Sequence, residues 1–159
     1  KGYIVFHTHG AYDTHNWFVE KWVSLANKVK KPIVFTGVDS VYVEKIISQL
    51  GKKNVFNATK TSISEYFGWI KRADCVVTVD TSAMHVAAAF DRKVISLFGA
   101  GDSRVWKPNP QTQESIVLRK GDCHSCHKTV CALGNKQCMD LIGVDDVLLA
   151  LDRKDCVDQ

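Results

Sequence analysis

Short apolar runs alternate along this chain with longer segments in which apolar residues recur every three or four positions. The runs predict buried strands at Tyr3–His7, Pro32–Thr36, Asn54–Phe56, Cys75–Val79, Val94–Phe98 and Ser115–Leu118. The longer segments predict helices at His15–Val29, Ser40–Leu50, Ser62–Arg72, Ala83–Phe90 and Val144–Leu151. Strands that alternate with helices in this way form a parallel sheet covered on both faces. We therefore predict an α/β fold with a doubly wound, Rossmann-like parallel sheet.

Composition narrows the class of protein without indicating a function. With 159 residues, 45% of them hydrophobic and 24% charged, the chain has the size and balance of one globular domain with a packed core. Its formal charge of +4 suits an anionic ligand. The chain contains no dense Lys/Arg run of the kind that binds nucleic acid, so we expect no nucleic-acid partner. No apolar run reaches the roughly 20 residues that span a membrane.

The most informative stretch follows the apolar run Cys75–Val79. It reads Asp80-Thr81-Ser82-Ala83-Met84-His85 and leads into an alanine-rich helix. The first turn of a helix has unpaired backbone N–H groups and the positive end of the helix dipole, so it suits a phosphate group. On the residues alone, a second interpretation stays open, in which Asp80 and the hydroxyls only cap the helix and His85 is structural.

A second strand exit lies one strand-and-helix unit further on. The run Val94–Phe98 opens into Gly99-Ala100-Gly101-Asp102. This is not a Walker loop, because no Gly-Lys-Ser/Thr follows, and it is not a full Gly-x-Gly-x-x-Gly fingerprint. Because the carboxyl ends of parallel strands meet at one edge of a sheet, the two exits can build one ligand site.

Together these turns resemble glycosyltransferase family 9, the ADP-heptose:lipopolysaccharide heptosyltransferases. The family pattern is Asp-Thr/Ser-Gly-x-x-His, an Ala-rich helix, and a strand ending Leu-Phe-Gly-x-x-Asp. It is matched here by Asp80–His85 and Leu97–Asp102, with Ser82 in place of the usual Gly. The resemblance covers nearly the whole chain. It implies that residues 1–159 are a single nucleotide-sugar-binding domain, the carboxyl-terminal half of a GT-B-type enzyme whose amino-terminal acceptor domain is absent from this chain.

The resemblance also implies an activity and a set of site residues. The enzyme would transfer a sugar from an ADP-heptose-like donor to lipopolysaccharide core or a related glycan, with inversion and without a catalytic cofactor. His85 would stabilise the leaving diphosphate, and the general base would lie in the amino-terminal domain, so this chain alone is expected to be inactive. The expected donor-binding residues are Asp80, Thr81, Ser82, His85, Thr8, His15 and Gly99.

Two positions depart from the family pattern or stay ambiguous. His15 stands where the family has a Lys that binds the diphosphate, and a histidine has less charge at neutral pH. Thr61 falls where the family places a residue against the base, with helix capping as the equally open alternative.

The cysteines form a second pattern, in a segment that we interpret as a Cys-rich insertion at residues 121–140. Cys123, Cys126, Cys131 and Cys138 have the spacing C-x2-C-x4-C-x6-C. Clustered thiols of this kind indicate metal or redox chemistry. Three alternatives stay open: a structural zinc ion held by all four thiols, disulfides, or free thiols. None of them makes the cluster catalytic.

Two other classes of function also stay open on the sequence. One is a stand-alone nucleotide-binding module without transfer activity, and the other is a metal- or redox-linked interaction domain built on the Cys cluster. The resemblance implies three partners, namely a nucleotide-diphosphate sugar, a glycan or lipopolysaccharide-core acceptor, and the amino-terminal domain of the same enzyme. No leader precedes the run Tyr3–His7, so we expect a fragment or trimmed chain of a cytoplasmic protein, peripheral at the inner membrane.

Overall fold

A six-stranded parallel sheet forms the centre of the chain, in a computed structural model that describes residues 2–51, 53–109, 115–123 and 125–152. Its strands are β1 (Ile4–His7), β2 (Ile33–Thr36), β3 (Val55–Asn57), β4 (Cys75–Val79), β5 (Lys93–Leu97) and β6 (Ser115–Leu118). Their spatial order is β3-β2-β1-β4-β5-β6, and every neighbouring pair is parallel. The chain winds outward from β1 to β3 and then from β4 to β6, which confirms the predicted doubly wound sheet.

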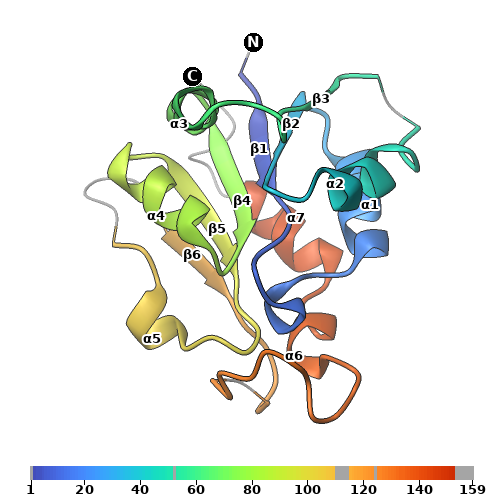
Figure 1. Ribbon diagram of the computed structural model, residues 1–159, viewed down its shortest axis with the longest axis vertical. Helices are drawn as coiled ribbons and strands as arrows, with labels where there is room; N and C mark the ends of the chain where they lie inside the picture. Colours follow the sequence, from blue (N-terminus) through green and yellow to red (C-terminus); the bar gives the residue numbers. More distant parts are fainter. Residues whose placement is uncertain (1, 52, 110–114, 124, 153–159) are drawn as a thin grey trace.

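Helices cover both faces of this sheet (Figure 1). They are η1 (Asp13–His15, a 3-10 turn), α1 (Val19–Lys28), α2 (Ser40–Ile47), α3 (Ile63–Lys71), α4 (Ser82–Ala89), α5 (Ser103–Trp106), α6 (Gln137–Asp140) and α7 (Val144–Asp152). One apolar core packs α1, α2 and α7 against the face that includes Phe6, and a second packs α3 and α4 against the face that includes Val5. None of the helices within the described ranges is long and apolar enough to cross a membrane.

Side-chain caps fix where two helices next to the carboxyl edge of the sheet begin. The predicted capping box of α3 is confirmed, because the Ser62 hydroxyl accepts the Glu65 N–H (3.3 Å) and the Glu65 carboxylate accepts the Ser62 N–H (2.8 Å). At the start of α4 the Thr81 hydroxyl accepts the Ala83 N–H at 3.3 Å. The turn after β4 therefore passes directly into the first turn of α4.

The first predicted helix begins later than expected. Helix α1 begins at Val19, whereas the sequence pattern predicts a start at His15. His15 ends the 3-10 turn η1, and Asn16 and Phe18 are extended, in a stretch that tertiary contacts hold. The Asn16 side chain accepts the Gly10 N–H at 2.7 Å, and the buried Trp17 indole donates to the Ile142 carbonyl at 3.0 Å.

Other helix boundaries also differ from the prediction. Helix α2 ends at Ile47 and not at Leu50, because the side chains of Ser48 and Gln49 donate hydrogen bonds to the Lys45 carbonyl oxygen (3.1 and 2.8 Å). The short helices α5 and α6 were not predicted. Both lie in segments without apolar periodicity, and α5 depends on a cap in which the Asp102 carboxylate accepts the Arg104 N–H at 2.9 Å.

Candidate functional site

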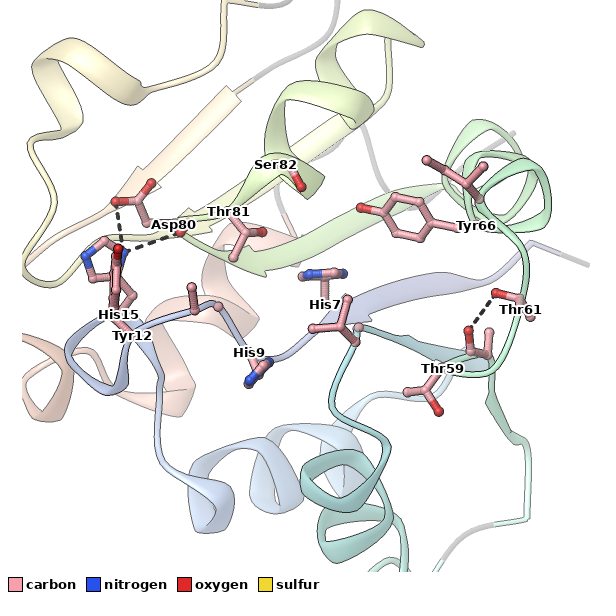
Figure 2. A pocket seen from close by; sticks show the side chains of 16 residues that line it. His7, His9, Tyr12, His15, Thr59, Thr61, Tyr66, Asp80, Thr81 and Ser82 are labelled. Atoms are coloured by element: carbon pink, nitrogen blue, oxygen red, sulfur yellow. Dashed lines mark hydrogen bonds and ion pairs between the residues drawn. The ribbon is translucent and has the colours of Figure 1, made fainter. Parts of the chain in front are cut away.

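A pocket of about 640 Å³ lies at the carboxyl ends of β1 to β4. Four loops form its wall, namely the segment after β1, the turn after β2 at Gly37 and Val38, the segment between β3 and α3, and the turn from Asp80 to Ser82. The strand order reverses between β1 and β4, and ligands of open α/β sheets bind at such a switch point. Figure 2 shows His15 and Asp80 together at one end and Tyr66 and Thr61 at the other.

Asp80 is the acidic group at one end of the pocket. Its carboxylate is about nine-tenths buried, and Oδ2 lies 3.5 Å from Nδ1 of His15 (Figure 2). Burial raises the pKa of the Asp80 carboxyl. Positive charge on His15, His85 or His127 acts in the opposite direction and lowers that pKa. The aspartate is therefore the centre of a group of histidines that come from three separate segments of the chain.

Two glycines after β5 are closely packed, and one of them packs against this pair. A Cβ atom at Gly101 would overlap Oδ2 of Asp80 and would lie 3.7 Å from Cε1 of His15. At Gly99 a Cβ atom would lie 2.7 Å from both the Met139 sulfur and the Thr14 carbonyl oxygen. Close packing therefore requires glycine at both positions, although neither glycine lines the pocket itself.

The other end of the pocket has an aromatic hydroxyl among apolar and hydroxyl side chains. The Tyr66 hydroxyl is buried and faces the Ser82 side chain (Figure 2), which acts to lower the pKa of Tyr66, without a well-formed hydrogen bond to any described residue. Burial raises the pKa of Tyr66 to about 12, so this hydroxyl stays protonated and can donate to a ligand. Val38, Ala58 and Ile63 line the same region and suit a flat apolar group such as a base.

Two histidines, one at the end of β1 and one just after it, line the pocket. Nδ1 of His7 lies 3.0 Å from the Thr36 hydroxyl oxygen, and burial together with the charge of His9 lowers the pKa of His7 to about 4. His7 is therefore neutral near pH 7. His9 approaches the cap of α2, with Nε2 3.9 Å from Oδ2 of Asp39, and its ring lies 5.7 Å from that of Tyr42.

The Cys-rich segment docks onto the Asp80 end of the site. The buried Thr14 hydroxyl donates to the Lys128 carbonyl at 2.6 Å, and the His127 N–H donates to the Ala100 carbonyl at 3.0 Å. Nζ of Lys136 lies 2.9 Å from Oδ1 of Asp13. The segment thus links the turn after β1 to the turn after β5, and Figure 1 shows it below both.

The four clustered cysteines have free thiols in this arrangement. Cys138 is buried, which raises the pKa of its thiol, and the neighbouring Cys123 and Cys126 raise it further. Backbone N–H groups of residues 133–136 lower the pKa of the Cys131 thiol. In the described part of the chain, no three His, Cys, Asp or Glu side chains are placed to hold a metal ion. The disulfide alternative is not seen there, and the zinc alternative stays a prediction.

The family described as glycosyltransferase family 9 (heptosyltransferase) matches residues 1–137, well over half of the chain. This chain belongs to glycosyltransferase family 9. The membership confirms the resemblance inferred from the turns at Asp80–His85 and Leu97–Asp102.

Several family-9 relatives resemble the chain in sequence or fold. Lipopolysaccharide heptosyltransferase 3 of Escherichia coli (strain K12) is 32% identical over 96 residues, which are 60% of this chain and 27% of that protein. The structure of E. coli ADP-heptose LPS heptosyltransferase II has a TM-score of 0.78 and 21% identity, over 96% of this chain and 46% of its own. A family-9 glycosyltransferase of Veillonella parvula has a TM-score of 0.81 and 22% identity, over 96% of this chain and 45% of its own. The structure of an E. coli heptosyltransferase with ADP has a TM-score of 0.73 and 22% identity, over 94% of this chain and 43% of its own.

These likenesses define what the chain shares with its relatives. At identities near 22%, the structures show the same fold. The chain spans less than half the length of each of these proteins. The likeness therefore covers the fold of part of a family-9 enzyme and not the activity of a whole one.

The structure brings together some of the predicted donor-site residues of this family-9 chain and separates others. The pocket is lined by Asp80, Thr81, Ser82, His15 and also by Thr61. Thr8 is fully buried and does not line the pocket, and its hydroxyl has no hydrogen-bond partner among the described residues. His85 is exposed on α4 and does not line the pocket, and Gly99 packs against the Cys-rich segment.

Sequence reasoning missed several residues that line the pocket, notably His7, His9, Tyr12, Thr59 and Tyr66. His7 and His9 could have been found, because His7 ends a buried strand and His9 follows it at the edge where parallel sheets bind ligands. Tyr66 gives no such signal, since an aromatic residue on an amphipathic helix is ordinarily a core residue.

Proposed function

We propose that this chain is the donor-binding half of an inverting glycosyltransferase, and that its pocket binds the nucleoside diphosphate of an activated sugar. The observation that supports this most directly is the position of the turn Thr81–Ser82. It lies on the pocket wall at the switch point of the sheet and forms the first turn of the eight-residue helix α4. Backbone N–H groups and hydroxyls at a helix N-terminus are suited to phosphate oxygens.

The ligand of relatives supports an adenine nucleotide as the first candidate. Two solved family-9 neighbours are described as E. coli heptosyltransferase with ADP and with ADP-2-deoxy-2-fluoro heptose. For this chain we propose an ADP-heptose-like donor, with the base near Val38, Ala58 and Ile63 and the diphosphate near Ser82 and His15.

The proposed reaction divides the chemistry between two domains. An acceptor hydroxyl oxygen attacks the anomeric carbon of the donor, the bond from that carbon to the diphosphate oxygen breaks with its electron pair, and the acceptor proton passes to a carboxylate of the amino-terminal domain. We propose that His85 stabilises the departing diphosphate. Its place on the first turns of α4 and its influence on the Asp80 carboxyl support this role, whereas its exposure means that a donor or a second domain must approach it.

The remaining partners follow from the same proposal. The acceptor is lipopolysaccharide core or a related glycan, the amino-terminal domain of the same enzyme supplies its binding site, and the enzyme works on the cytoplasmic side, peripheral at the inner membrane. Family membership and the relatives named as lipopolysaccharide heptosyltransferases support these assignments.

A thermal-shift series with ADP, UDP, GDP and CDP tests the proposed ligand. At about 100 times its Kd, a ligand adds about 2.7 kcal/mol to the free energy of unfolding and raises Tm by about 5–10 °C. We expect ADP to give the largest shift. If none of the four changes Tm, the pocket does not bind a nucleoside diphosphate.

A transfer assay separates the donor domain from a complete enzyme. Because the proposed base and acceptor site lie outside this chain, we expect the isolated chain to bind ADP and to transfer no sugar. Sugar transfer by the pure 159-residue chain would contradict the division of roles. If a protein extended by an amino-terminal domain also binds ADP and transfers nothing, the chain is a nucleotide-binding module.

A further inference from the structure

The short turn η1 joins the wall of the pocket to the Cys-rich segment. Tyr12, which precedes the turn, and His15, which ends it, line the pocket (Figure 2). Asp13 and Thr14 lie between them and contact the Cys-rich segment instead. The turn has three residues, and no side chain caps its amino end. Because a turn of this length is not stable alone, its position depends on the contacts of its outer side.

Thr14 is held from two sides. Its side chain is buried, and its hydroxyl donates to the carbonyl oxygen of Lys128 at 2.6 Å. Its own carbonyl oxygen would lie 2.7 Å from a Cβ atom at Gly99, so the backbone of the turn after β5 packs directly against it. Thr14 is therefore enclosed between the turn after β5 and the Cys-rich segment.

Lys136 ties η1 to a second point of the Cys-rich segment. Its Nζ atom lies 2.9 Å from Oδ1 of Asp13 and 4.8 Å from the centre of the Phe18 ring. The Lys136 side chain is only 16% exposed, so water screens this charge less than it screens an ordinary surface lysine. The Cys-rich segment thus holds two consecutive residues of η1, one through a hydrogen bond and one through an ion pair.

Between these ties the Cys-rich segment has little structure of its own. Residues 125–136, all of which the structure describes, form no helix or strand, and none of them belongs to either apolar core. Segments with few buried contacts open at a lower free energy than the core does. We therefore expect this segment to open while the sheet stays folded.

We propose that the Cys-rich segment is a strap across η1, with Thr14 as the positioning residue, and that the pocket binds its nucleotide only while the strap is closed. When the strap opens, η1 loses both outer ties, and Tyr12 and His15 are no longer held in the wall. Coupling of this kind is reciprocal, so a ligand that needs the closed strap also keeps it closed. The inference rests on the proposed function, because the ligand is the proposed nucleoside diphosphate.

Two buried cysteines report the opening of different parts of the chain. Cys138 belongs to the Cys-rich segment; burial raises the pKa of its thiol and the nearby Cys123 and Cys126 raise it further, so this segment covers it. Cys75 lies in the central strand β4 and becomes accessible only when the whole chain unfolds. The experiment follows the alkylation of each thiol by N-ethylmaleimide, peptide by peptide in mass spectrometry. The chain is reduced, and a chelator keeps the thiols free of metal.

The wild-type chain tests the strap without any substitution. Without ADP, Cys138 should react about tenfold faster than Cys75 or more, because the Cys-rich segment opens locally. ADP at about 100 times its Kd should slow the reaction of Cys138 by about tenfold or more, because it binds the closed strap. If Cys138 reacts no faster than Cys75, the segment does not open by itself and the strap is wrong.

Three variants test the role of Thr14. Thr14→Val removes the hydroxyl at nearly constant volume and should speed the reaction of Cys138 without ADP about fivefold. Thr14→Ser keeps the donor and should react within about twofold of wild type. Tyr3→Phe is the matched control, because it removes a hydrogen bond to the Trp69 carbonyl oxygen (2.8 Å) outside the pocket, and this bond persists while the strap is open. Equal rates of Cys138 in Thr14→Val and Tyr3→Phe would show that Thr14 does not hold the strap.

Calorimetry with ADP separates this inference from the proposed function. If ADP binds to the wild-type chain and Cys138 reacts equally fast with and without it, the coupling is wrong and the donor pocket stands. If ADP does not bind to a chain that circular dichroism shows to be folded, the proposed function fails and the coupling fails with it.

Discussion

Gly101 packs so closely against Asp80 that a Cβ atom at position 101 would overlap the aspartate Oδ2 atom. This contact joins the two strand exits that the sequence predicts as one site. The turn after β5 does not touch the pocket, yet it fixes the carboxylate that His15 faces. Gly101 therefore acts on the site through Asp80.

Gly101→Ala should destabilise the chain and weaken nucleotide binding, because the added methyl group must displace Asp80 or the turn. Overpacking of this kind costs about 1–3 kcal/mol. Urea unfolding measures the loss, with Gly51→Ala as the matched control, since nothing lies within 4 Å of a Cβ atom there. The control should stay within about 0.5 kcal/mol of wild type. Equal stability of the two variants would show that the contact does not constrain Asp80.

His7 gives the chain a pH-dependent stability. Its pKa is lowered to about 4 by burial and by His9, whereas the ordinary value is 6.5. The unfolded chain therefore binds the proton first, and the stability contributed by neutral His7 is present above about pH 6.5 and is lost as pH falls towards about 4. Between pH 7 and pH 5 this loss amounts to about 2 kcal/mol.

The His7→Gln variant isolates that loss from the other groups that titrate. Glutamine does not titrate, so its free energy of unfolding should fall less than that of wild type between pH 7 and pH 5. Urea titrations of both proteins at the two pH values give the difference. An identical loss in both would show that His7 is not the group responsible.

The state of the clustered cysteines is where the sequence interpretation and the structure differ. Their spacing predicts a zinc site as one alternative, whereas in the structure the thiols are free and the described residues contain no group of three metal-binding side chains. The zinc alternative stays a prediction, and metal analysis of the chain purified without chelators tests it. The exposed Cys126 should react with a thiol reagent before the buried Cys138. One bound zinc with all four thiols protected would establish the zinc alternative, and four reactive thiols without bound metal would rule it out.

The sheet was predictable because each strand is a local feature. Runs such as Cys75–Val79 are buried on both faces, and a parallel strand of this kind is recognisable from its own residues. The start of α1 was not, since the side chains of Asn16 and Trp17 are held before the helix by bonds to Gly10 and Ile142. The second of these bonds spans 125 positions of the sequence, which no local pattern reveals.

The same distinction applies to the site. The turn Asp80–Ser82 was predicted because a strand exit and a helix start coincide in one short stretch. The docking of the Cys-rich segment was not, because it depends on pairs such as Thr14 with Lys128, 114 positions apart. Gly99 was read as a ligand contact and packs against Met139, which sequence alone does not distinguish from an open glycine turn.

The most direct test of the central claim is a calorimetric titration of ADP into three proteins. They are wild type, Ser82→Trp, which fills the pocket from the first turn of α4, and Ser48→Trp, which places the same side chain on the exposed end of α2, outside the pocket. The donor-site account predicts one ADP per chain for wild type and Ser48→Trp, and a loss of about tenfold or more in affinity for Ser82→Trp. Unchanged affinity of folded Ser82→Trp for ADP would contradict it.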